Sequence, residues 1–368
     1  MLKIRFTLYI LILSLFISSC AIEIKQAPIG TPTTAQANND RRRTTSVTKV
    51  PVTWADLNLT GRLVYISGGD QVNFFTSTVE MLNLATGDVS TIFQADDNSF
   101  IYAVTVSPDG KQLVMSYSLS TAAGRSGNPA LYIMPLDGSS APQLLFPPVS
   151  EDDVYFQPLW SPDGKYIYYS HINLAPAKGQ QTQNVEIYRM AYPEMTMKKI
   201  AESAFWLNIS ADAKQIVYVS VNQANGADQL VLANSDGKNP QPVMISSNQA
   251  ANIIDAPLFS PDGQSILFSA VSTFQSSGPT WIEKLFGVTV ASAHTVPSDW
   301  WSVPVGGGRA KQLTHLQATS LNAAVSPDKK YIISDSSYGL FVMNPDGTDL
   351  RMLRRSAGSI PSTVNWIP

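Results

Sequence analysis

Cysteine is nearly absent from this chain of 368 residues, in which Cys20 is the only one. A lone thiol cannot form an internal disulfide, so the fold does not depend on disulfide bonds. Charged residues are only 14% of the chain, and no basic patch with interleaved aromatic residues is visible. That pattern argues against nucleic-acid binding. A Gly-x-Ser-x-Gly elbow is absent, and Gly306–Gly308 lacks the strand-to-helix context of a phosphate loop.

Long apolar runs are also missing, apart from Phe6–Ile17. This run is too short for a stable membrane span with its flanks, and Lys3 and Arg5 precede it. It ends in Ile17-Ser18-Ser19-Cys20, which resembles a bacterial lipobox. We therefore expect a lipoprotein signal peptide at residues 1–19 and lipid attachment to Cys20. The alternative is an uncleaved membrane anchor, or an ordinary signal peptide followed by a chance cysteine.

Residues 20–52 are rich in Thr, Ala, Pro, Gln and Asn, which predicts a disordered tether. Within it, Arg41–Arg43 either contacts anionic lipid headgroups or is a solvated charge run. Loss of Lys3 and Arg5 with the signal peptide changes the formal net charge from −3 to −5. We expect an extracytoplasmic protein, held by lipid on Cys20 at the periplasmic or cell-surface side of a bacterial membrane.

A short motif recurs along the rest of the chain. Ser-Pro-Asp-Gly begins at Ser107, Ser161 and Ser260, and degraded copies begin at Ser210 and Ser326. The intervals of 54, 49, 50 and 66 residues are typical of solenoids, propellers and arrays. Proline pre-sets φ, aspartate suits the next position and glycine accepts a positive φ. Each copy is therefore predicted to be a tight turn.

Strand-like runs flank each copy of the motif, as Leu159-Trp160 and Lys165–Ser170 do around the second. Each unit then continues through another strand, an Asp-Gly turn and a last strand, as in Leu131–Leu136, Asp137-Gly138 and Pro142–Leu145. Four strands in about fifty residues match one propeller blade. A continuous helical pattern of comparable length is absent. The fold class is therefore all-β.

Six blades account for residues 53–368. The first lacks the tetrapeptide but has a matching strand at Gly61–Ser67, and five more blades follow. The chain ends in Val364–Pro368, which matches Pro158–Pro162 at the first strand of a blade. We expect this segment to complete the first blade, so that pairing of the chain ends closes the ring and removes an exposed sheet edge.

These residues carry a family resemblance. Trp-Ser-Pro-Asp-Gly-Lys at residues 160–165, a β-run, Leu-Tyr-x-Met before Asp-Gly, and a Gln-Leu-Thr-like end resemble the WD40-like, TolB-type β-propeller repeat. The resemblance covers roughly residues 55–368 and implies a six-bladed propeller. It does not imply TolB itself, because TolB has an α/β domain before its propeller. Residues 21–54 are too short and too polar to form one.

The repeat also predicts two different faces of the ring. The Ser-Pro-Asp-Gly and Asp-Gly turns lie at one face, and the long connections 68–79, 118–130, 172–185 and 271–298 lie at the other. Loops on a rigid scaffold are where recognition usually resides. The 271–298 insertion has an apolar helical face made by Trp281, Ile282, Leu285 and Phe286. It is either a short helix packed on the propeller or a lid, a docking element or a membrane-resting helix.

Candidate ligand residues lie on the long-connection face: Asp152, Asp153, His171, Asp255, His294, Trp300 and His315. The histidines come from blades three and five, which are not neighbours, so no metal site is predicted. The acidic residues at 151–153 form either a cation or sugar site with Asp255, or a solvated acidic loop. Trp300 either covers the channel mouth or belongs to the core.

We expect a monomeric, non-catalytic binding module without a cofactor, whose partner is an envelope protein, a peptide or a glycan. The alternative is a propeller enzyme or a solute-binding protein that acts on sugars or esters at the channel mouth. The α/β-hydrolase domain that accompanies similar propellers in prolyl oligopeptidase-like enzymes has no room in the chain.

Overall fold

The computed structural model describes residues 47–68, 77–121, 127–175, 185–221, 228–246, 254–271, 297–355 and 363–368. Cys20, the signal peptide, His294, most of the tether and most of the 271–298 insertion lie outside these ranges. Within them, the one helical element is the 3-10 turn η1 (Ala55–Leu57), and no helix is long and apolar enough to cross a membrane.

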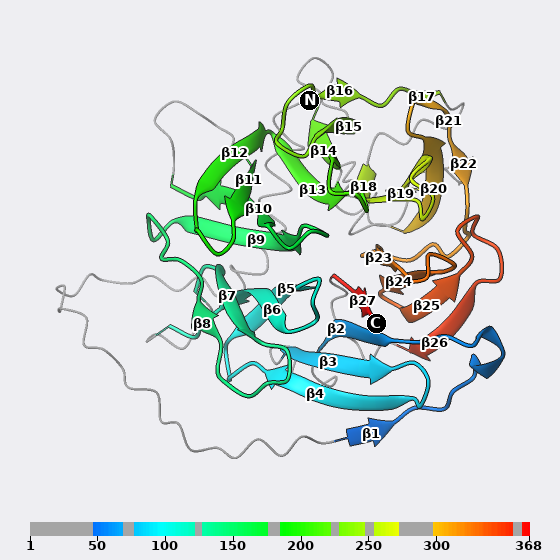
Figure 1. The fold of residues 1–368 in the computed structure, drawn as a ribbon, viewed down its shortest axis with the longest axis horizontal. Helices are drawn as coiled ribbons and strands as arrows, with labels where there is room; N and C mark the ends of the chain where they lie inside the picture. The colour runs from blue at the N-terminus through cyan, green and yellow to red at the C-terminus, as the bar shows by residue number, and fades with distance from the viewer. Residues whose placement is uncertain are drawn as a thin grey trace, which may run out of the picture.

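Antiparallel sheets of four or five strands surround a common centre, and each is one blade (Figure 1). Blade 1 contains β27 (Asn365–Ile367), β2 (Arg62–Gly68), β3 (Ser77–Asn83) and β4 (Asp88–Gln94), with β1 (Val47–Lys49) outside β4. Blade 2 contains β5 (Phe100–Val106), β6 (Gln112–Ser118), β7 (Ala130–Pro135) and β8 (Gln143–Leu144). Blade 3 contains β9 (Asp153–Trp160), β10 (Tyr166–Asn173), β11 (Glu186–Ala191) and β12 (Met197–Glu202).

The second half of the ring has the same organisation. Blade 4 contains β13 (Ala204–Ile209), β14 (Gln215–Val221), β15 (Asp228–Asn234) and β16 (Gln241–Pro242). Blade 5 contains β18 (Ile254–Phe259), β19 (Ser265–Val271), β20 (Ser298–Pro304) and β22 (Lys311–Gln312). Blade 6 contains β23 (Asn322–Val325), β24 (Ile332–Ser336), β25 (Gly339–Met343) and β26 (Arg351–Arg355). A parallel pair, β17 (Ile245–Ser246) and β21 (Gly308–Arg309), links blades 4 and 5. The predicted all-β, six-bladed fold is confirmed.

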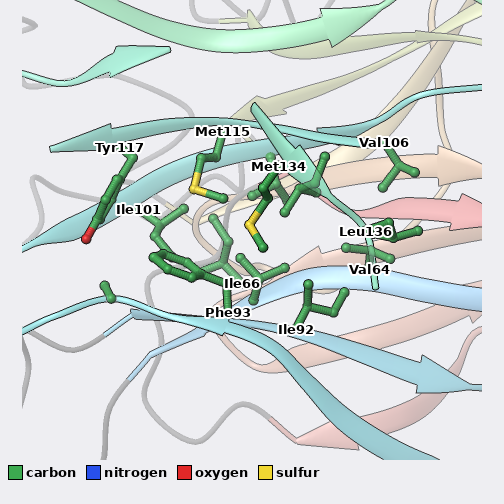
Figure 2. Packing of buried hydrophobic residues seen from close by; sticks show 14 of the residues in the cluster. Val64, Ile66, Ile92, Phe93, Ile101, Val106, Met115, Tyr117, Met134 and Leu136 are labelled. Atoms are coloured by element: carbon green, nitrogen blue, oxygen red, sulfur yellow. The ribbon is translucent and has the colours of Figure 1, made fainter. Parts of the chain in front are cut away.

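The hydrophobic core is divided among the seams between neighbouring blades. Figure 2 shows the seam between blades 1 and 2, where Val64 and Ile66 pack with Ile101 and Met115. β6 is buried along nearly its whole length, because blades cover both of its faces. Its burial therefore lacks the alternation of a half-exposed strand, and the buried Ser116 hydroxyl donates to Tyr155 O at 2.7 Å.

The five Ser-x-Asp turns are held by the same two side chains. Ser161 Oγ donates to Asp163 Oδ1 at 2.7 Å and accepts from the Tyr166 N–H at 2.9 Å. Asp163 Oδ1 also accepts from the Lys165 N–H at 3.2 Å. The same bonds recur in the copies that begin at Ser107, Ser210, Ser260 and Ser326. The serine hydroxyl, which the turn prediction did not use, is thus part of every turn.

The fourth residue of these turns is left-handed with or without glycine. Gly110 and Gly164 have φ of 69° and 71°, while Ala213 and Lys329 in the degraded copies have φ of 58° and 60°. A Cβ built at Gly110 or Gly164 has no neighbour within 4 Å. The cost of a side chain here is therefore conformational, on the order of 1 kcal/mol per turn.

The two ends of the chain meet in blade 1. β27 pairs antiparallel with β2, with Arg62 opposite Ile367 and Leu63 opposite Trp366. The Trp366 indole N–H donates to Thr60 O at 2.9 Å, and its ring joins the core between blades 6 and 1. In Figure 1 the red C-terminal strand lies beside the blue β2. The closure predicted from residues 364–368 is confirmed.

Polar side chains of the innermost strands link neighbouring blades. Asn365 Oδ1 accepts from the Val106 N–H at 3.1 Å, which joins blade 1 to blade 2. Thr105 Oγ1 accepts from the Trp160 N–H at 3.2 Å, which joins blade 2 to blade 3. Asn208 makes the corresponding bond between blades 4 and 5. These bonds satisfy donors on strand edges that face the centre of the ring.

The folded domain begins earlier along the chain than the tether boundary implies. β1 lies within the segment predicted to be tether and pairs with β4, with Val47 opposite Ser90 and Lys49 opposite Asp88. The Val50 N–H then donates to Gly87 O at 2.9 Å. A short β-branched run in a polar segment becomes a strand here because blade 1 offers it an open edge.

Candidate binding face

Each blade has two different ends. Turns between its first and second strands, and between its third and fourth, lie at one end, which we call the short-turn face. Connections between second and third strands, and between blades, lie at the other end, the long-loop face. The division follows from antiparallel strands in simple order, because successive connections alternate between the two ends.

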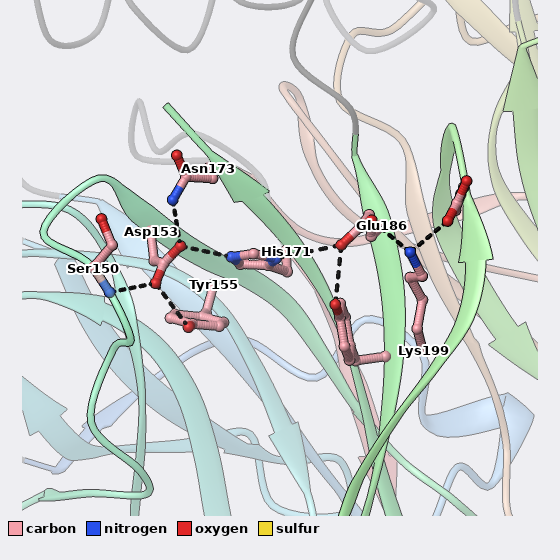
Figure 3. Close-up of polar contacts among 9 residues, drawn as sticks. Ser150, Asp153, Tyr155, His171, Asn173, Glu186 and Lys199 are labelled. Carbon is pink, nitrogen blue, oxygen red and sulfur yellow. Dashed lines mark hydrogen bonds and ion pairs between the residues drawn. The ribbon is translucent and has the colours of Figure 1, made fainter. Parts of the chain in front are cut away.

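Strand pairing brings Asp153 and His171 together at the long-loop face. Asp153 begins β9 opposite Asn173 near the end of β10. Asp153 Oδ1 lies 2.9 Å from His171 Nε2 and accepts from Asn173 Nδ2 at 2.8 Å (Figure 3). Its Oδ2 accepts from the Ser150 N–H at 2.7 Å and from the Tyr155 hydroxyl at 3.3 Å. Both oxygens of a residue that is only 4% exposed therefore have donors.

The environment of Asp153 keeps it ionised. Burial acts to raise the pKa of Asp153, but hydrogen bonds from His171, Asn173 and the Ser150 N–H outweigh it and hold that pKa below its usual range. Burial, together with the charge of Asp153, raises the pKa of Tyr155 to about 12. The pair at neutral pH is thus a buried carboxylate beside a neutral phenol.

A second carboxylate extends the charges across blade 3. Glu186 lies opposite His171 on β11, with Oε2 3.7 Å from His171 Nδ1 and 3.0 Å from the donating Tyr188 hydroxyl. Its Oε1 accepts from Lys199 Nζ at 3.0 Å, and Lys199 also contacts Glu202. Hydrogen bonds to Glu202 and Glu186 raise the pKa of Lys199. We call Asp153, His171, Glu186, Lys199 and Glu202 the charged row.

Aromatic rings support the charged row. Tyr155 stacks on the His171 ring with centroids 4.9 Å apart, and Tyr169 stacks on Tyr188 at 5.6 Å. Phe146, from the connection between blades 2 and 3, meets Tyr155 edge-on at 5.2 Å. These rings belong to the core at this seam. They fix the orientation of the imidazole and tie the connection to blade 3.

The side chains of the charged row pair with one another. The ring nitrogens of His171 face the carboxylates of Asp153 and Glu186. A histidine that activates a nucleophile instead needs a hydroxyl or thiol within hydrogen-bond reach. Among the residues that the structure describes, no group of three or more His, Cys, Asp or Glu could hold a metal ion. The row can orient the connection before β9 through the Ser150 N–H bond to Asp153, and the exposed Glu202 carboxylate is already paired with Lys199.

The remaining candidates are not part of the charged row. Asp152 is exposed immediately before Asp153. Asp255 is completely buried in blade 5, which blade 4 separates from blade 3. His315 is exposed after β22, with Nδ1 3.2 Å from Gln312 Nε2. His294 lies outside the described residues.

Trp300 belongs to the core at the seam between blades 5 and 6. It is completely buried there, and its Nε1 donates to Ser334 Oγ at 2.9 Å. The neighbouring Asp299, which was not among the predicted residues, is also completely buried. It accepts from the Thr314 hydroxyl at 3.1 Å and the Gln317 N–H at 3.2 Å, and so holds the connection to blade 6. The sequence signal for Asp299 is its position directly before Trp300 and Trp301. A carboxylate next to two core tryptophans is expected to be buried, and a buried carboxylate requires hydrogen-bond donors.

Comparison with solved structures shows the fold alone. TolB from Acinetobacter baumannii is similar with a TM-score of 0.57 and 16% identity, over 82% of this chain and 66% of that one. Hydrazine synthase from Kuenenia stuttgartiensis has a TM-score of 0.56 and 13% identity, over 81% and 45%. A chain of a nidogen/laminin complex has a TM-score of 0.53 and 10% identity, over 82% and 97%. No protein-family model and no curated protein matches the sequence. The propeller is thus shared with enzymes and with binding proteins.

Proposed function

We propose that this chain is a lipid-anchored, extracytoplasmic β-propeller that binds an envelope protein, a peptide or a glycan on its long-loop face, without catalysis. The contrast between the faces carries the proposal. The short-turn face repeats one turn five times, whereas the long-loop face has an ordered charged row on blade 3. Specificity on a rigid scaffold comes from such non-repeated features.

The proposed anchor rests on the N-terminal sequence. The apolar run that ends in Ile17-Ser18-Ser19-Cys20 supports acylation of Cys20, and each buried methylene of an acyl chain adds about 0.8 kcal/mol of membrane binding. Metabolic labelling with radioactive palmitate tests it. We expect label on the wild-type protein and none on Cys20→Ala. Undiminished label on that variant would place the lipid elsewhere and refute the proposal.

We also propose that the blades are TolB-type repeats. The recurring Ser-x-Asp turns and the structural similarity to TolB support this.

Photo-crosslinking of the full-length protein in its own membranes tests the binding face. A photoreactive residue at Asp152 probes the long-loop face, and one at the exposed Glu194 probes the short-turn face as a matched control. We expect a discrete adduct from position 152 and none from position 194. Equal adducts, or none at position 152, would contradict the proposed face. Turnover of a sugar or ester that Asp153→Asn abolishes would favour the enzyme alternative.

A further inference from the structure

An apolar projection stands beside the charged row. The connection between blades 2 and 3 exposes Pro147, Pro148 and Val149, and the exposed fraction of Val149 is 94%. Leu119, just after β6, is 49% exposed on the same face. Single exposed apolar residues are ordinary, but a group at one seam indicates an interaction surface.

The projection is preformed. On its N-terminal side, Phe146 packs against Tyr155, and on its C-terminal side the Ser150 N–H donates to Asp153. The consecutive prolines between these anchors have fixed φ. A surface that is already ordered loses little conformational entropy when a partner covers it.

Hydrogen bonds connect the projection to neighbouring segments. Asn128 Nδ2 donates to Glu151 O at 2.8 Å, and the Gly127 N–H donates to Leu119 O at 2.9 Å. The Ser120 N–H donates to Ser99 Oγ at 3.0 Å. We call this continuous surface the blade 2–3 rim, which comprises residues 96–99, 119–121, 127–129 and 144–153.

The described charges of the rim have one sign. Asp96, Asp97, Glu151 and Asp152 are all exposed, and no lysine or arginine occurs among the described residues of the rim. Arg125, in the same loop as Leu119, lies outside the described residues. Acidic side chains therefore lie on the connection that carries the apolar projection and on the connection between blades 1 and 2.

Several lysines and arginines among the described residues pair with carboxylates away from the rim. Lysines 111, 165, 214 and 330 each lie beside the aspartate of their own Ser-x-Asp turn, on the short-turn face. On the long-loop face, Lys199 contacts Glu186 and Glu202, and Arg354 contacts Glu80. The described residues of the rim therefore carry only negative charge, and their field reaches about one Debye length, roughly 8 Å at physiological salt.

We propose that the blade 2–3 rim docks a basic segment of a partner protein. Lys or Arg side chains of that segment pair with the four exposed rim carboxylates, and an apolar side chain contacts Val149. Complementary charge selects the partner and speeds the encounter, while burial of Val149 and Leu119 supplies affinity. This inference rests on the proposed binding function and names the chemistry of the partner.

Binding of a fluorescent Lys- and Leu-containing peptide to the full-length protein tests the rim. Anisotropy at physiological ionic strength gives the Kd, and a Glu- and Leu-containing peptide is the negative probe. One variant neutralises the rim with Asp96→Asn, Asp97→Asn, Glu151→Gln and Asp152→Asn. A matched variant neutralises four exposed carboxylates of the short-turn face with Asp137→Asn, Glu194→Gln, Asp346→Asn and Asp349→Asn. Both variants change the net charge equally, and their melting curves verify folding.

We expect the rim variant to weaken binding at least about tenfold and the matched variant less than about twofold. Val149→Ser is expected to weaken it about threefold. Equal weakening by the two charge variants, or equal binding of the acidic peptide, would overturn the proposal.

Photo-crosslinking from position 152 distinguishes failure of the basic-partner inference from failure of the proposed binding function. One variant carries the photoreactive residue at position 152 and has the other three exposed rim carboxylates neutralised. If this variant still forms the adduct, the basic-partner inference fails and the binding function stands. If the photoreactive residue at position 152 forms no adduct when the other three carboxylates are intact, the binding function fails.

Discussion

The two faces of the propeller use aspartate in different ways. On the short-turn face, five aspartates bind the serine of their own turn with the same geometry. On the long-loop face, Asp153 and Asp299 are buried, and each has its own set of donors. Repetition therefore marks what every blade needs in order to turn. A buried carboxylate with its own set of donors marks what one seam needs.

Removal of the Asp153 carboxylate should have the largest effect. Asp153→Ala leaves Asn173, His171 and the Ser150 N–H without their acceptor, and we expect the free energy of unfolding to fall by about 3 kcal/mol. Urea unfolding measures it. The exposed Asp152→Ala is the control, with an expected change within about 0.5 kcal/mol. Equal losses in the two variants would remove the distinction between a buried and a solvated long-loop carboxylate.

Removal of one turn bond should have a smaller effect. Ser161→Ala and Asp163→Ala each remove the hydroxyl–carboxylate bond at 2.7 Å, and we expect each to destabilise by about 1 kcal/mol. The double variant should lose less than the sum, because the two side chains share that bond. Ser210→Ala repeats the test in a copy without Pro and Gly. An unchanged stability there would show that the serine does not support the turn.

Restoring glycine to a degraded turn should stabilise the protein slightly. Ala213 and Lys329 have positive φ, so Ala213→Gly and Lys329→Gly are each expected to add about 0.5–1 kcal/mol to the free energy of unfolding. Ala211→Gly in the same turn is the control, because its φ is not positive and glycine there should destabilise. A gain from Ala211→Gly would mean that the effect does not come from φ.

Acid should weaken both faces in the same pH range. The pKa of Asp153 is lowered despite burial, and the pKa of Asp163 is lowered by its serine and backbone donors despite partial burial. A carboxyl with a lowered pKa contributes stability that is full above its unfolded pKa, near 4, and is lost as pH falls through its folded pKa. Urea unfolding between about pH 5 and pH 3 should show this loss, with a shallower slope for Asp153→Asn. An identical slope would place the acid sensitivity outside the charged row.

The six-bladed architecture was predictable because the repeated turn motif marks each blade in the sequence. The turns divide the chain into blades, and residues 364–368 match an inner strand closely enough to predict closure. The hydrogen bond from the serine of each Ser-x-Asp turn could also have been predicted from the sequence. The copy at 210–213 has lost Pro and Gly but keeps Ser210 and Asp212, the two side chains that form the hydrogen bond.

The charged row was only partly predictable. Asp153 and His171 lie on either side of a recognisable hairpin, so their proximity follows from antiparallel pairing. Glu186 and Lys199 come from strands beyond a long connection, whose register depends on loop geometry that composition does not determine. The burial of Asp299 was missed for a related reason, since its donors belong to the next connection along the chain.

Closure of the ring sets an order of events for the newly made chain. Thr60 and Trp366, which are bonded in blade 1, are 306 positions apart. During synthesis, β2 must therefore keep one edge unpaired until β27 has been made. Contacts of such separation form slowly, and an open strand edge in the meantime invites association with other chains. The first sheet to be made is thus the last to be completed, and loss of the final four residues would damage the beginning of the domain.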